Sequence, residues 1–263
     1  MSRSKTTRVS RLALTLALAG LLSVLTAPGA QAASGMPLGS FETYKPAPFA
    51  GSGPWGVAAG PDGAMWITEL QGNAIGRITM DGRVAQFPIS TLGANPFDIA
   101  AGPDGSMWFT EWNGNKIGRI TMNGTITEVP VPTAGSGPWG IALGPDGAMW
   151  FTEWNGNKIG RITMDGTITE YPVLTANAIP HDIALGPDGA MWFTESAGNR
   201  VGRITMNGTV TEFVMPKASR QPDGIAAGPD GAMWFTQWQG NAIGRIAMDG
   251  SITEYSVPTA AAG

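Results

Sequence analysis

Hydrophobic and polar residues alternate over short distances in this chain, and one pattern recurs along its length. In residues 138–173 the apolar stretch GIALG (140–144) leads into the turn GPDG (144–147), the β-rich run AMWFTE (148–153) and the loop WNGN (154–157). KIGRIT (158–163), the turn MDG (164–166) and the alternating run TITEYPV (167–173) complete the unit. Asp-Gly and Asn-Gly favour tight hairpins, because they tolerate positive φ at the central positions. The pattern predicts four short strands.

This unit returns every 42 residues. One tryptophan marks the second predicted strand of each copy, at Trp66, Trp108, Trp150, Trp192 and Trp234. Five copies follow one another without a gap, at 54–95, 96–137, 138–179, 180–221 and 222–263. A period of this length with β character indicates propeller blades, since one such unit cannot bury its own faces alone. We therefore expect an all-β protein, a β-propeller of four-stranded blades.

An extra outer strand is predicted ahead of the first full repeat. FETYKPAPFAGSGPWG (41–56) is similar to TITEVPVPTAGSGPWG (125–140), so residues 33–53 should contain an outer strand and a linker. The last repeat already has its own outer strand, ITEY (252–255). Either the extra strand adds to or replaces a sheet edge, as in propellers that close their ring with terminal strands, or five repeats form an incomplete ring. If the five blades do not close, we expect self-association.

The first 32 residues differ in composition from the rest. Basic residues precede an apolar run from Leu12 to Leu25, and the small-residue motif Ala30-Gln31-Ala32 follows. This order is typical of a secretory signal peptide that is cleaved after Ala32. The alternative is an uncleaved anchor, but the apolar run is short for a membrane span. We expect a secreted, extracellular bacterial protein without a membrane attachment after cleavage.

Composition narrows the classes of partner and chemistry. The chain has 263 residues, a net charge of −4 and 14% charged residues, so it has no basic patch to collect the phosphates of a nucleic acid. It has no cysteine, which excludes disulfides, thiol nucleophiles and thiolate metal sites. No G-x-S-x-G nucleophile motif, P-loop or zinc motif occurs. The expected partner is a small molecule.

Subtracting the repeat separates the framework from candidate chemistry. Tryptophan and methionine pairs such as Met107 and Trp108 recur in every repeat and are expected to pack between blades. The repeated arginines are expected to pair between blades; they are Arg77, Arg119, Arg161, Arg203 and Arg245. Glutamates end the second strand in four repeats, at Glu69, Glu111, Glu153 and Glu195. Departures from the repeat concentrate in its last two copies: His181, Asp182, Ser196, Lys217, Arg220, Gln221, Asp223 and Gln237.

The only histidine, His181, follows the proline that begins the fourth repeat; at this blade-start position the other repeats carry Trp55, Phe97, Trp139 and Asp223. His181 and Asp223 are the catalytic candidates. Trp154 and Trp238 follow the second strand of their repeats. If these loops meet at one mouth of the ring, His181, Trp139, Trp154 and Trp238 form a binding surface suited to a macrocyclic or glycosidic ligand. Packing of the loops on neighbouring blades is the alternative.

Three motifs together resemble the virginiamycin B lyase family, also called streptogramin B lyases. They are PHDIALGPDGAMWFTE (180–195), GNKIGRIT (114–121 and 156–163) and ITEYPV (168–173). The resemblance implies a seven-bladed propeller and a carbon–oxygen lyase of antibiotic resistance. Family members open the lactone of type B streptogramins, which are cyclic depsipeptides, by elimination. A histidine base takes the proton α to the ester carbonyl, and bound Mg²⁺ stabilises the developing charge.

The family site has two histidines one repeat apart and two metal-binding glutamates, and the resemblance places it here in two registers. In the first, His181 matches the substrate-contacting histidine and Asp223 stands in the place of the base. Gln221 and Gln237 then replace the metal glutamates.

In the second register, His181 is the base and Glu195 matches a ligand of Mg²⁺. Ile179 then replaces the other carboxylate, and Trp139 replaces the other histidine. Two other hypotheses stand beside the lyase. One is a non-catalytic extracellular propeller that binds a ligand, and the other is a truncated, recently amplified set of blades without independent function.

Overall fold

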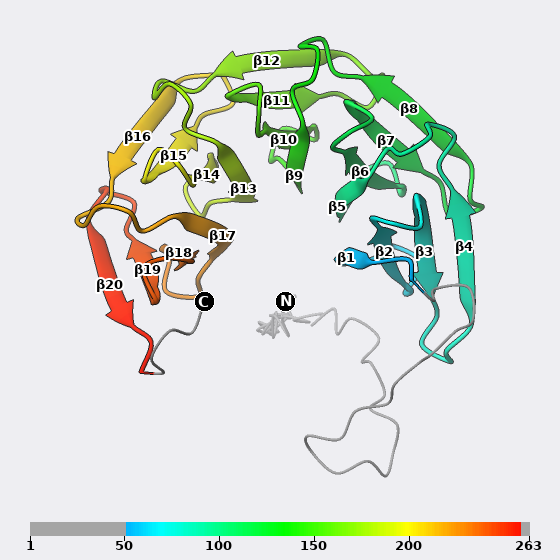
Figure 1. Ribbon diagram of the computed structural model, residues 1–263, viewed down its shortest axis with the longest axis horizontal. Helices are drawn as coiled ribbons and strands as arrows, with labels where there is room; N and C mark the ends of the chain where they lie inside the picture. The colour runs from blue at the N-terminus through cyan, green and yellow to red at the C-terminus, as the bar shows by residue number, and fades with distance from the viewer. Residues whose placement is uncertain (1–50, 259–263) are drawn as a thin grey trace, which may run out of the picture. The chain divides into compact units, whose positions relative to one another are not determined.

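The computed structural model of the chain describes residues 51–258 (Figure 1). The predicted signal peptide, the predicted outer strand ahead of residue 51 and residues 259–263 lie outside this range. The described residues form strands, turns and loops, with no helix among them. Accordingly, nothing in the described range is a helix long and apolar enough to span a membrane.

The strands of residues 51–258 form five four-stranded antiparallel sheets, one for each 42-residue repeat, which confirms the predicted fold class. The first two sheets contain β1 (Pro54–Ala59), β2 (Met65–Glu69), β3 (Ala74–Ile78) and β4 (Val84–Pro88), then β5 (Pro96–Ala101), β6 (Met107–Glu111), β7 (Lys116–Ile120) and β8 (Ile126–Pro130). The third contains β9 (Pro138–Leu143), β10 (Met149–Glu153), β11 (Lys158–Ile162) and β12 (Ile168–Pro172). The last two contain β13 (Pro180–Leu185), β14 (Met191–Glu195), β15 (Arg200–Ile204) and β16 (Val210–Val214), then β17 (Pro222–Ala227), β18 (Met233–Gln237), β19 (Ala242–Ile246) and β20 (Ile252–Ser256).

The sheets stand next to one another in an arc (Figure 1). The first strand of each sheet lies on the inner side of the arc and contacts the first strand of the next sheet, so that β1, β5, β9, β13 and β17 form a continuous inner wall. The fourth strands form the outer side. Within the described part of the chain, the arc is open between the fifth sheet and the first, so these five sheets form an incomplete ring (Figure 1).

The hydrophobic core lies between neighbouring sheets. One core cluster joins Trp108, Ile117 and Val131 of the second sheet to Ile141, Met149, Phe151 and Ile162 of the third. Trp108 and Met149 are at most 1% exposed, which confirms that the repeated tryptophans and methionines pack between blades wherever two described sheets meet. A tryptophan buries on the order of 200 Å², so each such contact stabilises the fold by about 5 kcal/mol at roughly 25 cal/mol per Å².

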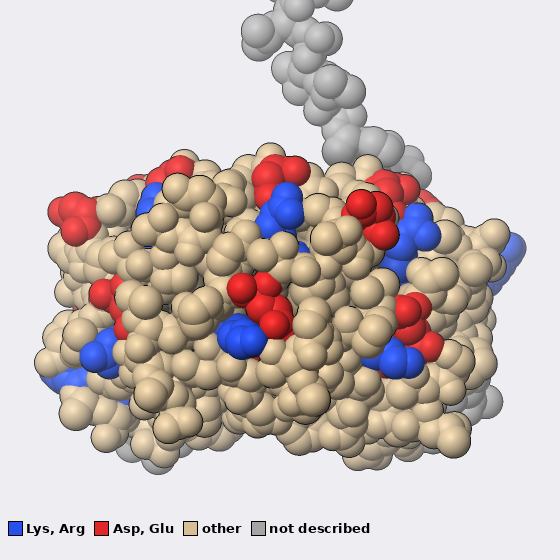
Figure 2. Space-filling view, turned by 90° about the horizontal axis from the view of Figure 1, so that it is seen from above, with Lys and Arg blue, Asp and Glu red and all other residues tan. Residues whose placement is uncertain are grey.

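The repeated arginines pair within their own sheet, so the expectation that they pair between blades is wrong. Arg161 Nε lies 2.6 Å from Asp146 Oδ2, and the Trp150 indole donates a hydrogen bond of 3.1 Å to the other oxygen of Asp146. Arg161 is the cross-strand partner of Trp150, so the guanidinium, 5.9 Å from the ring centroid, reaches the aspartate of the neighbouring turn. Figure 2 shows such acidic and basic side chains next to one another on one face of the molecule.

A threonine near the end of the second strand connects each of the first four sheets to the next. The Thr152 hydroxyl accepts a hydrogen bond of 2.9 Å from Gly140 N and donates one of 2.6 Å to the carbonyl oxygen of His181 in the next sheet. Thr68, Thr110 and Thr194 make the same contact with the blade-start carbonyls of Phe97, Trp139 and Asp223. The hydroxyls therefore fix the spacing of the inner wall.

Replacing Thr152 by valine should lower the free energy of unfolding by about 1–3 kcal/mol, because the buried N–H of Gly140 and the carbonyl of His181 each lose their partner. Denaturation by urea measures the change. Thr152→Ser is the matched control, since it keeps the hydroxyl and should cost less. A larger loss for Thr152→Ser than for Thr152→Val would show that the methyl group, and not the hydrogen bonds, carries the contribution.

Candidate functional site

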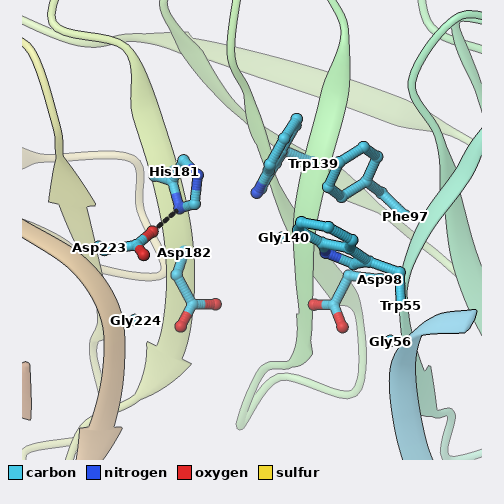
Figure 3. Close-up of a pocket in the computed structure, with 10 residues that line it drawn as sticks. All are labelled: Trp55, Gly56, Phe97, Asp98, Trp139, Gly140, His181, Asp182, Asp223 and Gly224. Atoms are coloured by element: carbon cyan, nitrogen blue, oxygen red, sulfur yellow. Dashed lines mark ion pairs between the residues drawn. The ribbon is translucent and has the colours of Figure 1, made fainter. Parts of the chain in front are cut away.

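The blade-start side chains meet on the inner side of the arc. They belong to Trp55, Phe97, Trp139, His181 and Asp223, and they line a cavity of about 290 Å³ (Figure 3). The antiparallel pairing of the first two strands is irregular there, with a register shift after Pro180 in the fourth sheet. Because every repeat places this residue at the same point, the site takes one side chain from each of the five described sheets.

The two catalytic candidates are in direct contact. His181 Nδ1 lies 2.6 Å from Asp223 Oδ1, as the dashed line in Figure 3 shows. The hydrogen bond from His181 lowers the pKa of Asp223, against the opposing effect of partial burial. The His181 side chain is 17% exposed and that of Asp223 is 37% exposed, so the pair is accessible from the cavity. This contact uses Nδ1, so the lone pair of Nε2 stays available.

Aromatic rings surround His181 on the side away from Asp223. We call Trp55, Phe97, Trp112, Trp139 and Trp154 the aromatic collar. The ring of His181 lies 4.8 Å from that of Trp139 and 5.0 Å from that of Trp154, measured between centroids. Trp139 in turn lies 3.5 Å from Phe97, and Phe97 lies 4.9 Å from Trp55. The collar is one continuous set of contacts across the first three sheets, and it reaches His181 of the fourth.

The predicted binding residues occupy different parts of this surface. Trp139 and His181 line the central cavity, whereas Trp154 packs against both of them. Trp238 is 61% exposed and lines a neighbouring cavity of about 280 Å³ that also reaches Trp139, His181 and Asp223. The structure thus brings all four predicted binding residues to one mouth of the arc.

Two carboxylates at the floor of the cavity were not predicted as site residues. Asp98 and Asp182 each follow a blade-start residue (Figure 3). Asp98 accepts a hydrogen bond from Ile141 N, and Asp182 accepts one from Ile225 N, so each carboxylate holds the first strand of the next sheet. Burial raises the pKa of Asp98 to about 7; the negative charge of Asp182 adds to this effect, and backbone hydrogen bonds oppose it.

The sequence contains a signal for these carboxylates. The position after the blade start alternates along the repeats as Gly56, Asp98, Gly140, Asp182 and Gly224. A side chain at Gly140 would come within 2.9 Å of the His181 carbonyl oxygen and 3.3 Å of the Asp182 carboxylate. Glycine in alternate sheets therefore provides the space that the aspartates fill.

Glu195, the predicted metal ligand, lies inside the fourth sheet. It lines neither the central cavity nor the neighbouring cavity beside Trp238. It is fully buried, and neither carboxylate oxygen has a hydrogen-bond partner. Burial raises its pKa to about 8, the charge of Glu212 raises it further, and Arg200 opposes the shift. Glu111 and Glu153 share the same burial and a pKa of about 8, so these properties belong to the repeat.

The residues that are present do not fit the Mg²⁺ expected from the family. Carboxylate oxygens are the preferred ligands of this cation. The described residues contain no cluster of three or more histidine, cysteine, aspartate or glutamate side chains able to hold a metal ion. Ile179, Gln221 and Gln237 stand where the two registers require carboxylates, and Glu195 is fully buried inside the fourth sheet.

Comparisons with known proteins point to one family. The model of the virginiamycin B lyase family matches residues 36–186 and 175–263. The crystal structure of selenomethionine-substituted virginiamycin B lyase from Staphylococcus aureus is 46% identical, with a TM-score of 0.79, and the alignment covers 81% of this chain and 73% of that chain. A catalytically inactive histidine-to-alanine variant from the same organism, solved with quinupristin, is 45% identical, with a TM-score of 0.78 over 80% of this chain and 71% of that chain.

A curated relative matches over a shorter stretch. Virginiamycin B lyase of Bordetella pertussis is 57% identical over 35 residues, which is 13% of this chain and 12% of the curated protein. This local match therefore spans about an eighth of the relative's own length, whereas the solved structures align over most of the repeats.

Replacing Glu153 by glutamine should stabilise the protein at alkaline pH. Burial raises the pKa of Glu153 from 4.5 to about 8, and the charge of Glu170 adds to this. Between these two values the folded state holds a proton that the unfolded chain has lost, so the free energy of unfolding falls as the pH rises from about 4.5 to 8. Glutamine does not ionise in this range, so Glu153→Gln removes this loss of stability. The fifth sheet already carries a glutamine, Gln237, at the same position. We expect a gain of about 2 kcal/mol or more at pH 8 and little at pH 4.5, measured by denaturation.

Glu170→Gln is the control for this prediction. Burial opposes ionisation of Glu170, but hydrogen bonds from Lys158 and Thr133 outweigh it and lower the pKa of this carboxyl. The control should therefore destabilise the protein at pH 8. A gain from Glu153→Gln that is equal at pH 4.5 and pH 8 would contradict the assigned protonation.

Proposed function

Because the chain belongs to the virginiamycin B lyase family, we propose that it binds a type B streptogramin or a related cyclic depsipeptide and opens its ring by elimination. The observation that carries this proposal is the contact of 2.6 Å between His181 and Asp223 beside the aromatic collar. It joins a potential base, a group that orients this base and an apolar binding surface at one place.

The aromatic collar suits the size and polarity of such a ligand. A cyclic depsipeptide presents apolar side chains around a ring of amide and ester groups, and ligand sites for such molecules combine aromatic walls with a few polar groups. Trp55 and Trp238 are 59% and 61% exposed at the two sides of the mouth, and His181 and Asp223 lie between them in the neighbouring cavity. The solved relative with quinupristin supports this ligand class.

His181 acts as the base in this proposal, and Asp223 is its positioning residue. The carboxylate holds the Nδ1–H tautomer and stabilises the imidazolium that forms when Nε2 takes a proton. Nε2 removes the proton from a carbon next to a carbonyl group. The electron pair of that C–H bond forms a double bond to the adjacent carbon, and the ester C–O bond on that carbon breaks. The ring opens to an alkene and a carboxylate, without addition of water.

The proposal also includes binding of Mg²⁺ and export of the protein, and each rests on its own observation. The motif resemblance supports Mg²⁺, whereas the donor set of the described residues does not provide its ligands. No step above depends on the metal. Export to the exterior of a bacterium is supported by the basic and apolar order of residues 1–32.

A second candidate function is binding without turnover. One observation favours it: the blade starts on either side of His181 carry Trp139 and Asp223, so the site has a single imidazole where the family resemblance implies two. In such a protein the aromatic collar sequesters the ligand, and the contact between His181 and Asp223 contributes to binding.

Incubation with quinupristin tests both functions. The elimination product has the same mass as the substrate but a different retention time, whereas hydrolysis would add the mass of water. We expect conversion by the wild type, a loss of about 10²-fold or more in kcat for His181→Ala, and a loss of kcat with little change in KM for Asp223→Asn. Parallel reactions with Mg²⁺ and with EDTA measure the metal dependence.

Val214→Ser is the control for this assay, since Val214 lies on the outer strand β16 and is 63% exposed. It should retain full activity. Saturable binding of quinupristin without any conversion would select the second function, and the absence of both binding and conversion would exclude the ligand class.

A further inference from the structure

The two end sheets of the arc each have one apolar side that no neighbouring sheet of the described residues covers. We call the exposed side of the first sheet the head face; it includes Val57, Ile67, Ile78, Met80 and Val84. We call the exposed side of the fifth sheet the tail face; it includes Ala226, Trp234, Ile243, Tyr255 and Val257. Val57 and Met80 are 61% and 63% exposed, and Tyr255 is 47% exposed.

The internal interfaces show that these faces are two halves of one contact. Between the fourth and fifth sheets, Trp192, Val201 and Phe213 pack against Ile225, Met233, Phe235 and Ile246. Trp192, Val201 and Phe213 occupy the same repeat positions as Trp234, Ile243 and Tyr255 of the tail face. Ile225 occupies the position of Val57 but is only 7% exposed. Each end sheet therefore carries one half of this core without the other.

The tail face is also hollowed where a neighbouring sheet would lie. A groove of about 360 Å³ is lined by Ile225, Ala226, Trp234, Phe235 and Ile243 together with polar neighbours. A side chain built at Gly140 would come within 2.9 Å of the next sheet, whereas at Gly224 the nearest atom is 3.6 Å away and belongs to its own sheet. The space occupied by the next sheet at the internal interfaces is therefore open at the fifth sheet.

The threonine hydrogen bond that connects neighbouring sheets is also incomplete at the tail face. The Thr194 hydroxyl donates a hydrogen bond of 2.5 Å to the carbonyl oxygen of Asp223 in the next sheet. Thr236 holds the equivalent position and accepts from Gly224 N at 3.0 Å, but it is exposed, with no following sheet in the described residues to supply the carbonyl. The carbonyl of Trp55 at the head face is the matching acceptor by repeat position.

We propose that the tail face binds the head face of a second copy of this chain. The two halves of the new contact have the same residue types at the same repeat positions as the two halves of each internal interface. It is a heterologous contact, since each copy contributes a different surface. The opening between the two faces is smaller than the arc itself, so the second copy must be displaced along the axis of the arc, and further copies can add to the free faces (Figure 1).

The second copy would also contribute to the ligand site. Along the arc, each blade-start side chain is followed by that of the next sheet, and Asp223 is the last of the series. The Trp55 of a second copy would lie on the side of Asp223 and Trp238 that no sheet of the described residues covers. The assembly itself does not depend on the proposed lyase activity.

Sedimentation velocity on two complementary variants tests this proposal. Val57→Glu places a charge on the head face and leaves the tail face intact, whereas Ala226→Arg blocks the tail face and leaves the head face intact. We expect the average mass of the wild type to rise above that of the monomer with concentration, while each variant alone remains monomeric. An equimolar mixture of the two variants should give a species of twice the monomer mass that does not grow further.

Val214→Glu is the matched control, because Val214 is as exposed as Val57 but lies on the outer strand of the fourth sheet. It should assemble like the wild type. Circular dichroism and thermal melting verify that every variant is folded. A wild type that stays monomeric up to about 100 µM, as expected if the five sheets close on themselves, would overturn the proposal. So would a mixture of folded variants that forms no dimer.

Discussion

A sheet of this protein has two apolar faces, and only neighbouring sheets can cover them. Trp150 of the third sheet is fully buried because Met191 and Phe193 of the fourth sheet pack against it. The Thr152 hydroxyl adds a directional bond to the next blade start. Because this contact recurs between all described neighbours, the inner strands keep a constant spacing. The identity of the blade-start residue can then change from Trp139 to His181 without a change in the backbone.

The site therefore combines a repeated framework with a few local exceptions. Alternating glycine and aspartate residues hold the inner strands, since Asp98 and Asp182 each bind the backbone of the next sheet. Burial raises the pKa of Asp182, and the backbone hydrogen bonds from Ile225 and Ile183 oppose this effect. The floor of the cavity is therefore built from buried carboxylates that hold the strands.

The fold could be predicted from the sequence because the same pattern of strands and turns occurs five times. The runs AMWFTE (148–153) and KIGRIT (158–163) agree with β10 and β11 to within one residue at each end. Contacts between sheets were harder to predict, since they depend on the relative placement of repeats. The contact of His181 with Asp223 and the role of Asp98 required the structure, and the arginines pair with aspartates of their own turns instead of neighbouring blades.

Glu195 shows how a repeat can imitate a functional motif. Its spacing from His181 in the sequence matches the family site. However, Glu111 follows Phe97 and Glu153 follows Trp139 at the same spacing, and neither of these blade-start residues is a histidine. All three glutamates are fully buried, each beside a second carboxylate that raises its pKa. In the first and fifth sheets one member of the pair is glutamine, at Gln86 and Gln237, and the nearby basic residue is replaced by Ala74 and Ala242. Such compensation is expected of a structural acid pair. A match at a repeated position therefore carries less information about function than the departures at His181 and Asp223.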